Sequence, residues 1–343
     1  MPGKDTSVDL GDGGDSHGIE HPAVAAWTRV SGHVGMPERV DVLKDTDRTK
    51  IYRLVRAGPG GSNVIAKQRA SGSLAEEQVI HLAVHPRLAA RTLKCYGFDE
   101  PDGATPCTLF LEDAGDEPYD GSDPTHRALA GGWLAAFHTV AAGTPLGAEA
   151  NALAERGSAY YLAELQAGRG VIEENLHTHP AELAETLREV LSCLDRVEGS
   201  WHKVAQMVAP APRTLVHADL KPNNVRLLAE DGAHDPAVLV LDWEYAGWGP
   251  PAVDLAQPPP GSEGLALGVD LDSYAAAVAG AWPELGRGAI DELAFAGTVF
   301  RASVAVSWAA ASLKYSGTER HVRSVAMHSA TLNRLSDEAG WGS

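Results

Sequence analysis

The sequence has few cysteines, no long apolar run and no excess of basic residues, and each absence excludes a class of protein. The three cysteines, Cys95, Cys107 and Cys193, lie far apart and match no metal-ligand spacing. We therefore expect no disulfide framework, and a reducing, cytoplasmic location. There is no apolar stretch of about 18 residues, so we expect no membrane span. Residues 1–18 lack the apolar segment of a signal peptide.

Acidic residues outnumber basic ones, 46 to 28, which gives a formal net charge of −18. Contacts with nucleic-acid phosphates need a basic surface, so this charge argues against general nucleic-acid binding. It suits a cationic ligand, although solubility alone is the commoner meaning of an acidic surface. With 343 residues, of which 44% are hydrophobic, the chain has enough material for one large or two modest globular domains.

The predicted elements change in type along the chain. Residues 1–20 are rich in Gly and Asp and predict a disordered or loosely packed tail. Residues 21–113 predict a β-rich N-terminal lobe, residues 114–124 a linker rich in Gly, Pro and Asp, and residues 125–343 a mainly helical C-terminal lobe.

Within the first lobe, a glycine-rich turn separates apolar runs at 51–55 and 63–67, which predicts a β-hairpin. A helix is expected at 73–83, followed by strands at 93–98 and 108–111. In the second lobe, apolar stripes predict amphipathic helices, and residues 293–313 predict a helix buried on all sides. The two stripes lie at 129–140 and 183–197.

The strongest chemical signal is the run HADLKPNNV at residues 217–225, a polar loop between two short apolar segments. It places a carboxylate, Asp219, before an amide, Asn224, and Asp242 follows at the end of an apolar strand. Phosphoryl transfer needs a carboxylate to accept a hydroxyl proton and oxygen ligands to hold Mg²⁺ against phosphates. The pattern therefore predicts Asp219 as the base and Asn224 and Asp242 as metal ligands.

This run resembles the catalytic loop of the protein-kinase-like superfamily, and more closely that of the aminoglycoside phosphotransferase and choline kinase branch. In that branch the loop reads H-G-D-x-x-x-x-N, and a later strand ends in I-D-W or I-D-F. Here Ala218 replaces the Gly, which size alone predicts to be a mild change, and Leu241–Glu244 reads L-D-W-E. The resemblance implies a two-lobed α+β kinase-like fold, Mg²⁺ as cofactor, and ATP, or alternatively GTP, as phosphoryl donor.

The same resemblance favours a small hydroxylated acceptor over a protein. No Arg precedes Asp219, Phe-Gly does not follow Asp242, and there is no A-P-E segment. Lys221 resembles the protein-kinase lysine that touches the γ-phosphate. Asp254 and His217 are expected to brace the loop.

In the N-terminal lobe, Lys67 resembles the lysine of V-A-I-K, which binds the α- and β-phosphates and pairs with a helical Glu. We choose Glu76 over Glu77 because Val79 and Ile80 follow Glu76 on the expected inward stripe. Ser62, in the glycine turn, is expected to donate to phosphate, although an ordinary hairpin turn is an equal alternative. Residues 109–114, with Glu112 and Ala114, resemble the hinge that binds the base.

The acceptor pocket is expected among helices of 125–210 and 265–335. We favour an antibiotic acceptor, either an aminoglycoside or a sugar-bearing nucleoside; the alternatives are an amino sugar, choline or homoserine, or a catalytically inactive nucleotide sensor. An aminoglycoside site should contain several clustered carboxylates, for which residues 112–123 and 270–272 are candidates. Trp201, Trp243 and Trp248 are candidates for the pocket wall or for the core. The sequence carries no signal for oligomeric state.

Overall fold

A computed structural model describes residues 7–8, 21–32, 35–69, 74–100, 107–143, 145–228, 236–314 and 318–341. The chain forms two compact units. The N-unit consists of residues 1–117 and 226–244, and the C-unit of residues 118–225 and 245–343. The tail predicted at 1–20 lies outside the described residues except for Ser7–Val8.

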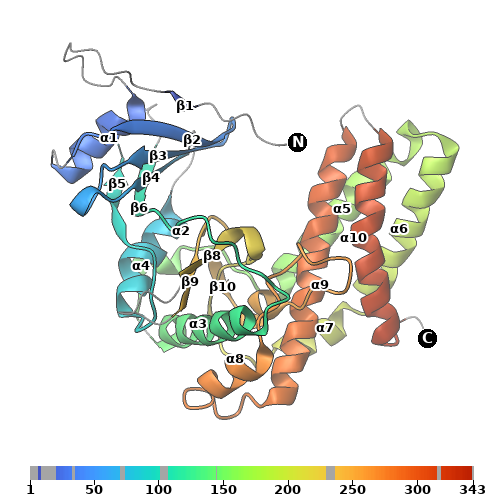
Figure 1. Ribbon diagram of the computed structural model, residues 1–343. Coiled ribbons are helices and arrows are strands. Elements are labelled where there is room, and N and C mark those ends of the chain that lie inside the picture. Colours follow the sequence, from blue (N-terminus) through green and yellow to red (C-terminus); the bar gives the residue numbers. More distant parts are fainter. Residues whose placement is uncertain are drawn as a thin grey trace. The chain divides into compact units, whose positions relative to one another are not determined.

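The N-unit is built on an antiparallel sheet whose described strands follow the order β1-β2-β3-β4-β6-β5 (Figure 1). The predicted hairpin is confirmed, with Ile51 paired to Lys67. Its two strands flank a short 3₁₀ turn at Pro59–Gly61. The strands are β1 (Ser7–Val8), β2 (Arg39–Asp45), β3 (Thr49–Val55), β4 (Val64–Arg69), β5 (Cys95–Asp99) and β6 (Cys107–Glu112).

One face of this sheet packs against helix α1 (Pro22–Ser31). Val64, Ala66 and Phe110 are fully buried there, in one cluster with Trp27 of the helix. Side chains alternate along a strand, so Lys67, which follows Ala66, points to the opposite face. The sheet therefore separates its apolar core from the side that carries the lysine.

The helix expected at 73–83 is shorter and less regular than predicted. Helix α2 (Ala75–Gln78) passes into a π-helical segment (Val79–Val84) and then a 3₁₀ turn (His85–Arg87). Ser73, the first residue of the expected helix, lies outside the described residues. A small second sheet pairs β8 (Val225–Leu228) with β9 (Ala237–Val240), the strand that leads to Asp242.

The C-unit is mainly helical, and helices α5, α6, α9 and α10 lie side by side in it (Figure 1). The helices predicted at 129–140 and 183–197 are confirmed within α3 and α6, and the helix predicted at 293–313 is confirmed as far as Ala311, where α9 ends in a 3₁₀ turn. A short β7 (Thr214–Val216) pairs with β10 (Gly247–Gly249). The helices are α3 (Pro124–Gly143), α4 (Gly147–Asn151), α5 (Ser158–Asn175), α6 (Ala181–Gly199), α7 (Trp201–Val208), α8 (Leu271–Val278), α9 (Arg287–Ala311) and α10 (Thr318–Glu338).

Helix α9 is the core helix of the C-unit. Residues 287–314 are long and apolar enough to cross a membrane, but 78% of that apolar window is buried inside the protein. Gly297 lets α9 approach the 3₁₀ turn at Pro251–Leu255, because a Cβ there would lie 1.8 Å from the carbonyl oxygen of Ala252. This close approach brings α9 next to the turn that carries Asp254.

Candidate active site

The polar loop that follows β7 is held by a buried carboxylate. Asp254 accepts hydrogen bonds from the backbone N–H groups of His217, at 2.7 Å, and Ala218, at 2.9 Å. The backbone N–H of Asp219 donates to Nδ1 of His217 at 3.2 Å. Both bracing roles expected for Asp254 and His217 are therefore confirmed. Ala218 has a φ of +64°, a left-handed conformation that non-glycine residues rarely adopt.

Asp254 is itself fully enclosed, with His138 Nε2 3.3 Å from its Oδ2. Burial alone would raise the pKa of Asp254, but the hydrogen bonds from His138 and His217 outweigh it and hold the pKa below its ordinary value. On the far side of the imidazole, His138 Nδ1 lies 3.0 Å from the hydroxyl of Tyr274. The loop thus rests on a hydrogen-bonded network that is buried throughout.

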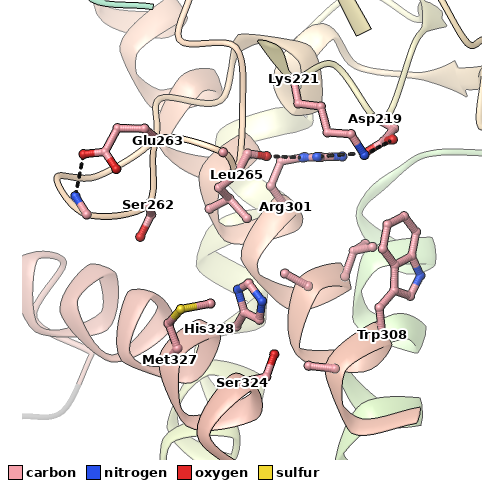
Figure 2. Close-up of a pocket in the computed structure, with 15 residues that line it drawn as sticks. Asp219, Lys221, Ser262, Glu263, Leu265, Arg301, Trp308, Ser324, Met327 and His328 are labelled. Carbon is pink, nitrogen blue, oxygen red and sulfur yellow. Dashed lines mark hydrogen bonds and ion pairs between the residues drawn. The ribbon is translucent and has the colours of Figure 1, made fainter. Parts of the chain in front are cut away.

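Both oxygens of Asp219 are engaged by donors (Figure 2). Oδ1 accepts from Arg301 Nη2 at 2.9 Å, and Oδ2 accepts from Lys221 Nζ at 2.7 Å. Asn224 Nδ2 donates to the carbonyl oxygen of Asp219 at 3.0 Å and to Oδ2 at 3.3 Å. The predicted residues Asp219, Lys221 and Asn224 therefore lie together, with the carboxylate held in one orientation.

Arg301 is a member of this site that the sequence analysis missed. It lies 82 residues after Asp219, on α9, and is 6% exposed. Its guanidinium also donates to the carbonyl oxygens of Leu265, at 2.9 Å, and Ala218, at 2.7 Å. Burying a guanidinium costs free energy unless a partner pairs with it. A single Arg in the middle of the apolar helix predicted at 293–313 was therefore the sequence signal that a buried acidic partner lies nearby.

In the N-unit, Lys67 contacts two carboxylates. Its Nζ lies 2.5 Å from Glu77 Oε1 and 2.5 Å from Asp242 Oδ1. Burial alone would lower the pKa of this ammonium, but the charges of Glu77 and Asp242 outweigh it and raise the pKa above its ordinary value. Lys67 therefore stays charged.

The prediction that Glu76 pairs with Lys67 is wrong, because the partner is Glu77. Glu77 is 2% exposed and Glu76 is only partly buried. The buried side chains of this segment are Glu77, Val79, Ile80, His81 and Val84, and Glu76 is not among them. The predicted burial of Val79 and Ile80 is confirmed, but Ile80 lies three residues after Glu77 and four after Glu76, so its burial does not distinguish the two glutamates.

The oxygen donors predicted for Mg²⁺ belong to different units, Asn224 to the C-unit and Asp242 to the N-unit. Because the amide nitrogen of Asn224 faces Asp219, its amide oxygen is the atom suited to a cation. Among the described residues, no three His, Cys, Asp or Glu side chains gather into a metal cage. Mg²⁺ in nucleotide sites takes one or two protein oxygens besides phosphate and water, and an amide oxygen or a carboxylate oxygen is a donor of that kind.

The sequence profile of the phosphotransferase enzyme family matches residues 42–257. The chain belongs to this family. A comparison with curated proteins found no match. The phosphotransferase also resembles solved structures at low identity, which establishes a common fold.

Three of these structures are small-molecule kinases or phosphotransferases. Choline kinase from Cryptosporidium parvum is 12% identical with a TM-score of 0.57, over 88% of this chain and 90% of the other. Aminoglycoside phosphotransferase APH(2″)-IIIa, in a GDP and kanamycin complex, is 12% identical with a TM-score of 0.59, over 92% of this chain and 98% of the other. A thermostable mutant of APH(4)-Ia, in a ternary complex with ADP and hygromycin B, is 13% identical with a TM-score of 0.52, over 86% of this chain and 92% of the other. These similarities confirm the two-lobed α+β kinase-like fold, and family membership confirms that the chain is a phosphotransferase.

The other nucleotide residues predicted for the phosphotransferase occupy a different part of the N-unit. Glu112 pairs with Arg91 and lies opposite Val64, on the face of the sheet away from Lys67. Ser62 and Glu112 line one cavity of about 530 Å³ there. Ala114 is buried in a core cluster with Leu93 and Leu239. Roles for Ser62, Glu112 and Ala114 in binding the nucleotide stay predictions.

The C-unit of the phosphotransferase contains a cavity of about 600 Å³ that begins at Asp219 (Figure 2). Its other walls are the loop at 261–265 and the facing sides of α9 and α10. Trp201, Trp243 and Trp248 are buried core residues and do not line this cavity. The tryptophan in its wall is Trp308. The acidic stretches predicted for an aminoglycoside lie outside the lining of this cavity. Among their residues, Asp270 caps α8 and Asp272 pairs with Arg287.

Proposed function

We propose that this protein transfers the γ-phosphoryl group of ATP to a hydroxyl of a small molecule bound in the Asp219 cavity. The acceptor oxygen forms a bond to the γ-phosphorus while the bond from that phosphorus to the bridging oxygen of ADP breaks. The hydroxyl proton passes to Asp219 and then to solvent. The products are ADP, the phosphorylated acceptor and one proton.

The observation that carries this proposal is the placement of Asp219. Its carboxylate lies at the end of a cavity large enough for a drug-sized molecule, and Arg301, Lys221 and Asn224 hold it in one orientation. A base that is already oriented loses little freedom when the acceptor binds. Family membership makes phosphoryl transfer the chemistry that this arrangement serves.

On the nucleotide side, we propose that Lys67, positioned by Glu77, binds the α- and β-phosphates. The oxygens of Asn224 and Asp242 would hold Mg²⁺, which when bound neutralises charge on the phosphates and orients them. GTP is an alternative donor, since the structure similar to this chain that contains kanamycin also contains GDP. A cytoplasmic location, where ATP is available, stays part of the proposal.

For the acceptor, we propose an antibiotic, so that phosphorylation would inactivate it and confer resistance. Similar structures are named for hygromycin B, kanamycin and choline kinase, which cover both the antibiotic and the primary-metabolite alternatives. Amino sugars, choline and homoserine are the competing acceptors. A catalytically inactive nucleotide sensor is the competing function.

The test is acceptor-dependent ADP release by the purified full chain with ATP and Mg²⁺, compared between wild type and Asp219→Asn. The variant keeps the shape of the side chain but has no basic oxygen, so turnover should fall by about 10³-fold or more. Nucleotide binding, measured by calorimetry, should stay within a few-fold of wild type. Turnover by Asp219→Asn at the wild-type rate would refute the assigned base, and tight ATP binding without ADP release from any acceptor would favour the sensor.

A further inference from the structure

We infer that the acceptor is an uncharged hydroxyl compound with an apolar or aromatic part, such as an aryl glycoside or a nucleoside, rather than a polycation. This inference rests on the proposed function and concerns the charge and polarity of the same cavity. Three features of the cavity wall lead to it: its carboxylates, its cations and its apolar side chains.

The described lining of the cavity contains two carboxylates, Asp219 and Glu263. Both oxygens of Asp219 are already occupied by cationic or amide donors. Glu263 folds back on its own loop, where its Oε1 accepts from the backbone N–H of Gly261 at 2.8 Å (Figure 2). Recognition of several ammonium groups requires several carboxylates free to face them, and this wall does not supply that set.

The two cationic side chains that line the cavity already have partners within the protein. Lys221 and Arg301 both bind Asp219, and Arg301 also donates to two backbone carbonyls. Burial lowers the pKa of His328 below its ordinary value, which keeps the imidazole neutral at pH 7. An anionic acceptor would have to compete with Asp219 for its counter-ions, so the wall favours neither a polycation nor an anion.

What the wall does offer is apolar surface. Trp308 on α9 and Met327 on α10 are 44% and 57% exposed, and both line the cavity, as do the small apolar side chains of Val304, Ala305 and Ala309. Large apolar side chains left open to solvent on facing helices are typical of ligand-binding surfaces. Ser324 and His328 lie beside them and can form hydrogen bonds with hydroxyls (Figure 2).

The shape of this wall also argues against a small quaternary ammonium such as choline. Such groups are recognised by cages of several aromatic rings. In the described lining, Trp308 is the single indole or phenyl ring, and the cavity of about 600 Å³ is sized for a larger ligand. An acceptor that stacks a ring on Trp308 and presents a hydroxyl to Asp219 fits both observations.

The experiment compares matched acceptors with the full chain, ATP and Mg²⁺. The probes are 4-nitrophenyl β-D-glucoside and uridine as neutral compounds, 4-nitrophenyl β-D-glucuronide as the anionic match, kanamycin as the polycation and choline as the monocation. We expect kcat/KM from ADP release to be at least about tenfold higher for a neutral probe than for any charged one, which corresponds to about 1.4 kcal/mol. A preference for kanamycin, choline or the glucuronide would overturn the inference.

Binding of each probe to the protein, measured by calorimetry with a non-hydrolysable ATP analogue, separates the two proposals. A neutral probe that binds best without ADP release would support the inference and contradict the proposed function. ADP release with a charged probe that also binds best would do the reverse. Failure of every neutral probe to bind at 10 mM, a concentration chosen to reveal weak sites, would also overturn the inference.

Two methionine variants test the apolar wall. Met327→Ala should raise KM for the preferred neutral probe about fivefold while kcat stays within about twofold, because it removes apolar contact surface and not a reacting group. Met36→Ala is the matched control, since Met36 is 54% exposed but lies in the N-unit. Equal KM values for Met327→Ala and wild type would remove the apolar wall from acceptor recognition.

Discussion

Arg301 and Asp219 form a buried ion pair in the C-unit, with Nη2 2.9 Å from Oδ1 and both side chains at most 7% exposed. The same guanidinium binds the carbonyl oxygen of Ala218, so it contacts the loop at both the backbone and the side chain. Arg301 thereby links the core helix of the unit to the orientation of the proposed base. We regard Arg301 as a positioning residue.

Replacement of Arg301 by Lys should separate this positioning role from plain stability. Lysine keeps the charge but cannot donate in the planar fork that reaches three acceptors at once. We expect Arg301→Lys to lower kcat by about 10- to 100-fold, with the KM for ATP changed less than about threefold. Steady-state kinetics with the preferred acceptor and ATP in turn would measure both.

Arg156→Lys is the control for that variant. Arg156 is 9% exposed, lies in the same unit and donates to the carbonyl oxygen of Tyr245 at 2.9 Å. Within the part of the chain that the structure describes, it forms no hydrogen bond with Asp219. Both variants should lower the thermal midpoint, since each removes part of a buried guanidinium network. If both lowered kcat equally, Arg301 would have no role beyond stabilising the fold.

Short-range sequence patterns correctly predicted the order of the elements and the grouping of most residues of the polar loop at 217–225. The hairpin of β3 and β4, the helices α3, α6 and α9, and the approach of Lys221 and Asn224 to Asp219 each follow from short-range patterns. Arg301 could not be found in that way, because its partner lies 82 residues earlier and only the tertiary packing of α9 joins them.

Two misjudged residues show where sequence patterns fail. Glu76 was chosen because Val79 and Ile80 follow it, but Ile80 lies about one helical turn after Glu77 as well, so that pattern does not distinguish the two glutamates. Ala218 was judged by size, where the relevant property is its φ of +64°. Asp242 likewise has a φ of +63°, so both kinase-like motifs contain a left-handed residue that composition does not reveal.

The glutamate assignment gives a matched pair of variants, Glu77→Gln and Glu76→Gln. Glu77→Gln removes a charge 2.5 Å from the ammonium of Lys67, so we expect kcat/KM for ATP to fall about 10- to 100-fold. Glu76→Gln changes a neighbouring side chain that is less buried, and should stay within about twofold of wild type. A larger loss for Glu76→Gln would restore the original assignment and contradict the observed ion pair.

Ala218→Gly should stabilise the protein. A left-handed conformation costs a non-glycine residue roughly 1–2 kcal/mol, and glycine avoids this cost while losing some backbone entropy on folding. We expect the free energy of unfolding to rise by about 1 kcal/mol, measured by urea denaturation with an unchanged slope.

Ala163→Gly supplies the opposite case. Ala163 is exposed within α5, where glycine should lower the free energy of unfolding by about 1 kcal/mol. Destabilisation by Ala218→Gly of the same size as Ala163→Gly would mean that residue 218 is not left-handed in solution.

His85 is buried in the N-unit, with its ring centroid 4.8 Å from that of His81 and 5.6 Å from that of Trp243. Burial lowers the pKa of His85 to about 4, below the value of about 6.5 expected in the unfolded chain. The unfolded state therefore binds more protons between these two values, and stability is lost as the pH falls through that window. His81, whose pKa burial also lowers, acts in the same direction.

We expect His85 alone to account for about 2 kcal/mol of the loss in unfolding free energy between pH 7.5 and pH 5.0. His85→Phe keeps a ring in the cluster but cannot be protonated, so its pH dependence over this range should be smaller than that of wild type by that amount. His177→Phe, at an exposed position, should keep the wild-type dependence. Urea denaturation at the two pH values measures all three proteins, and parallel curves for wild type and His85→Phe would show that His85 is protonated equally in both states.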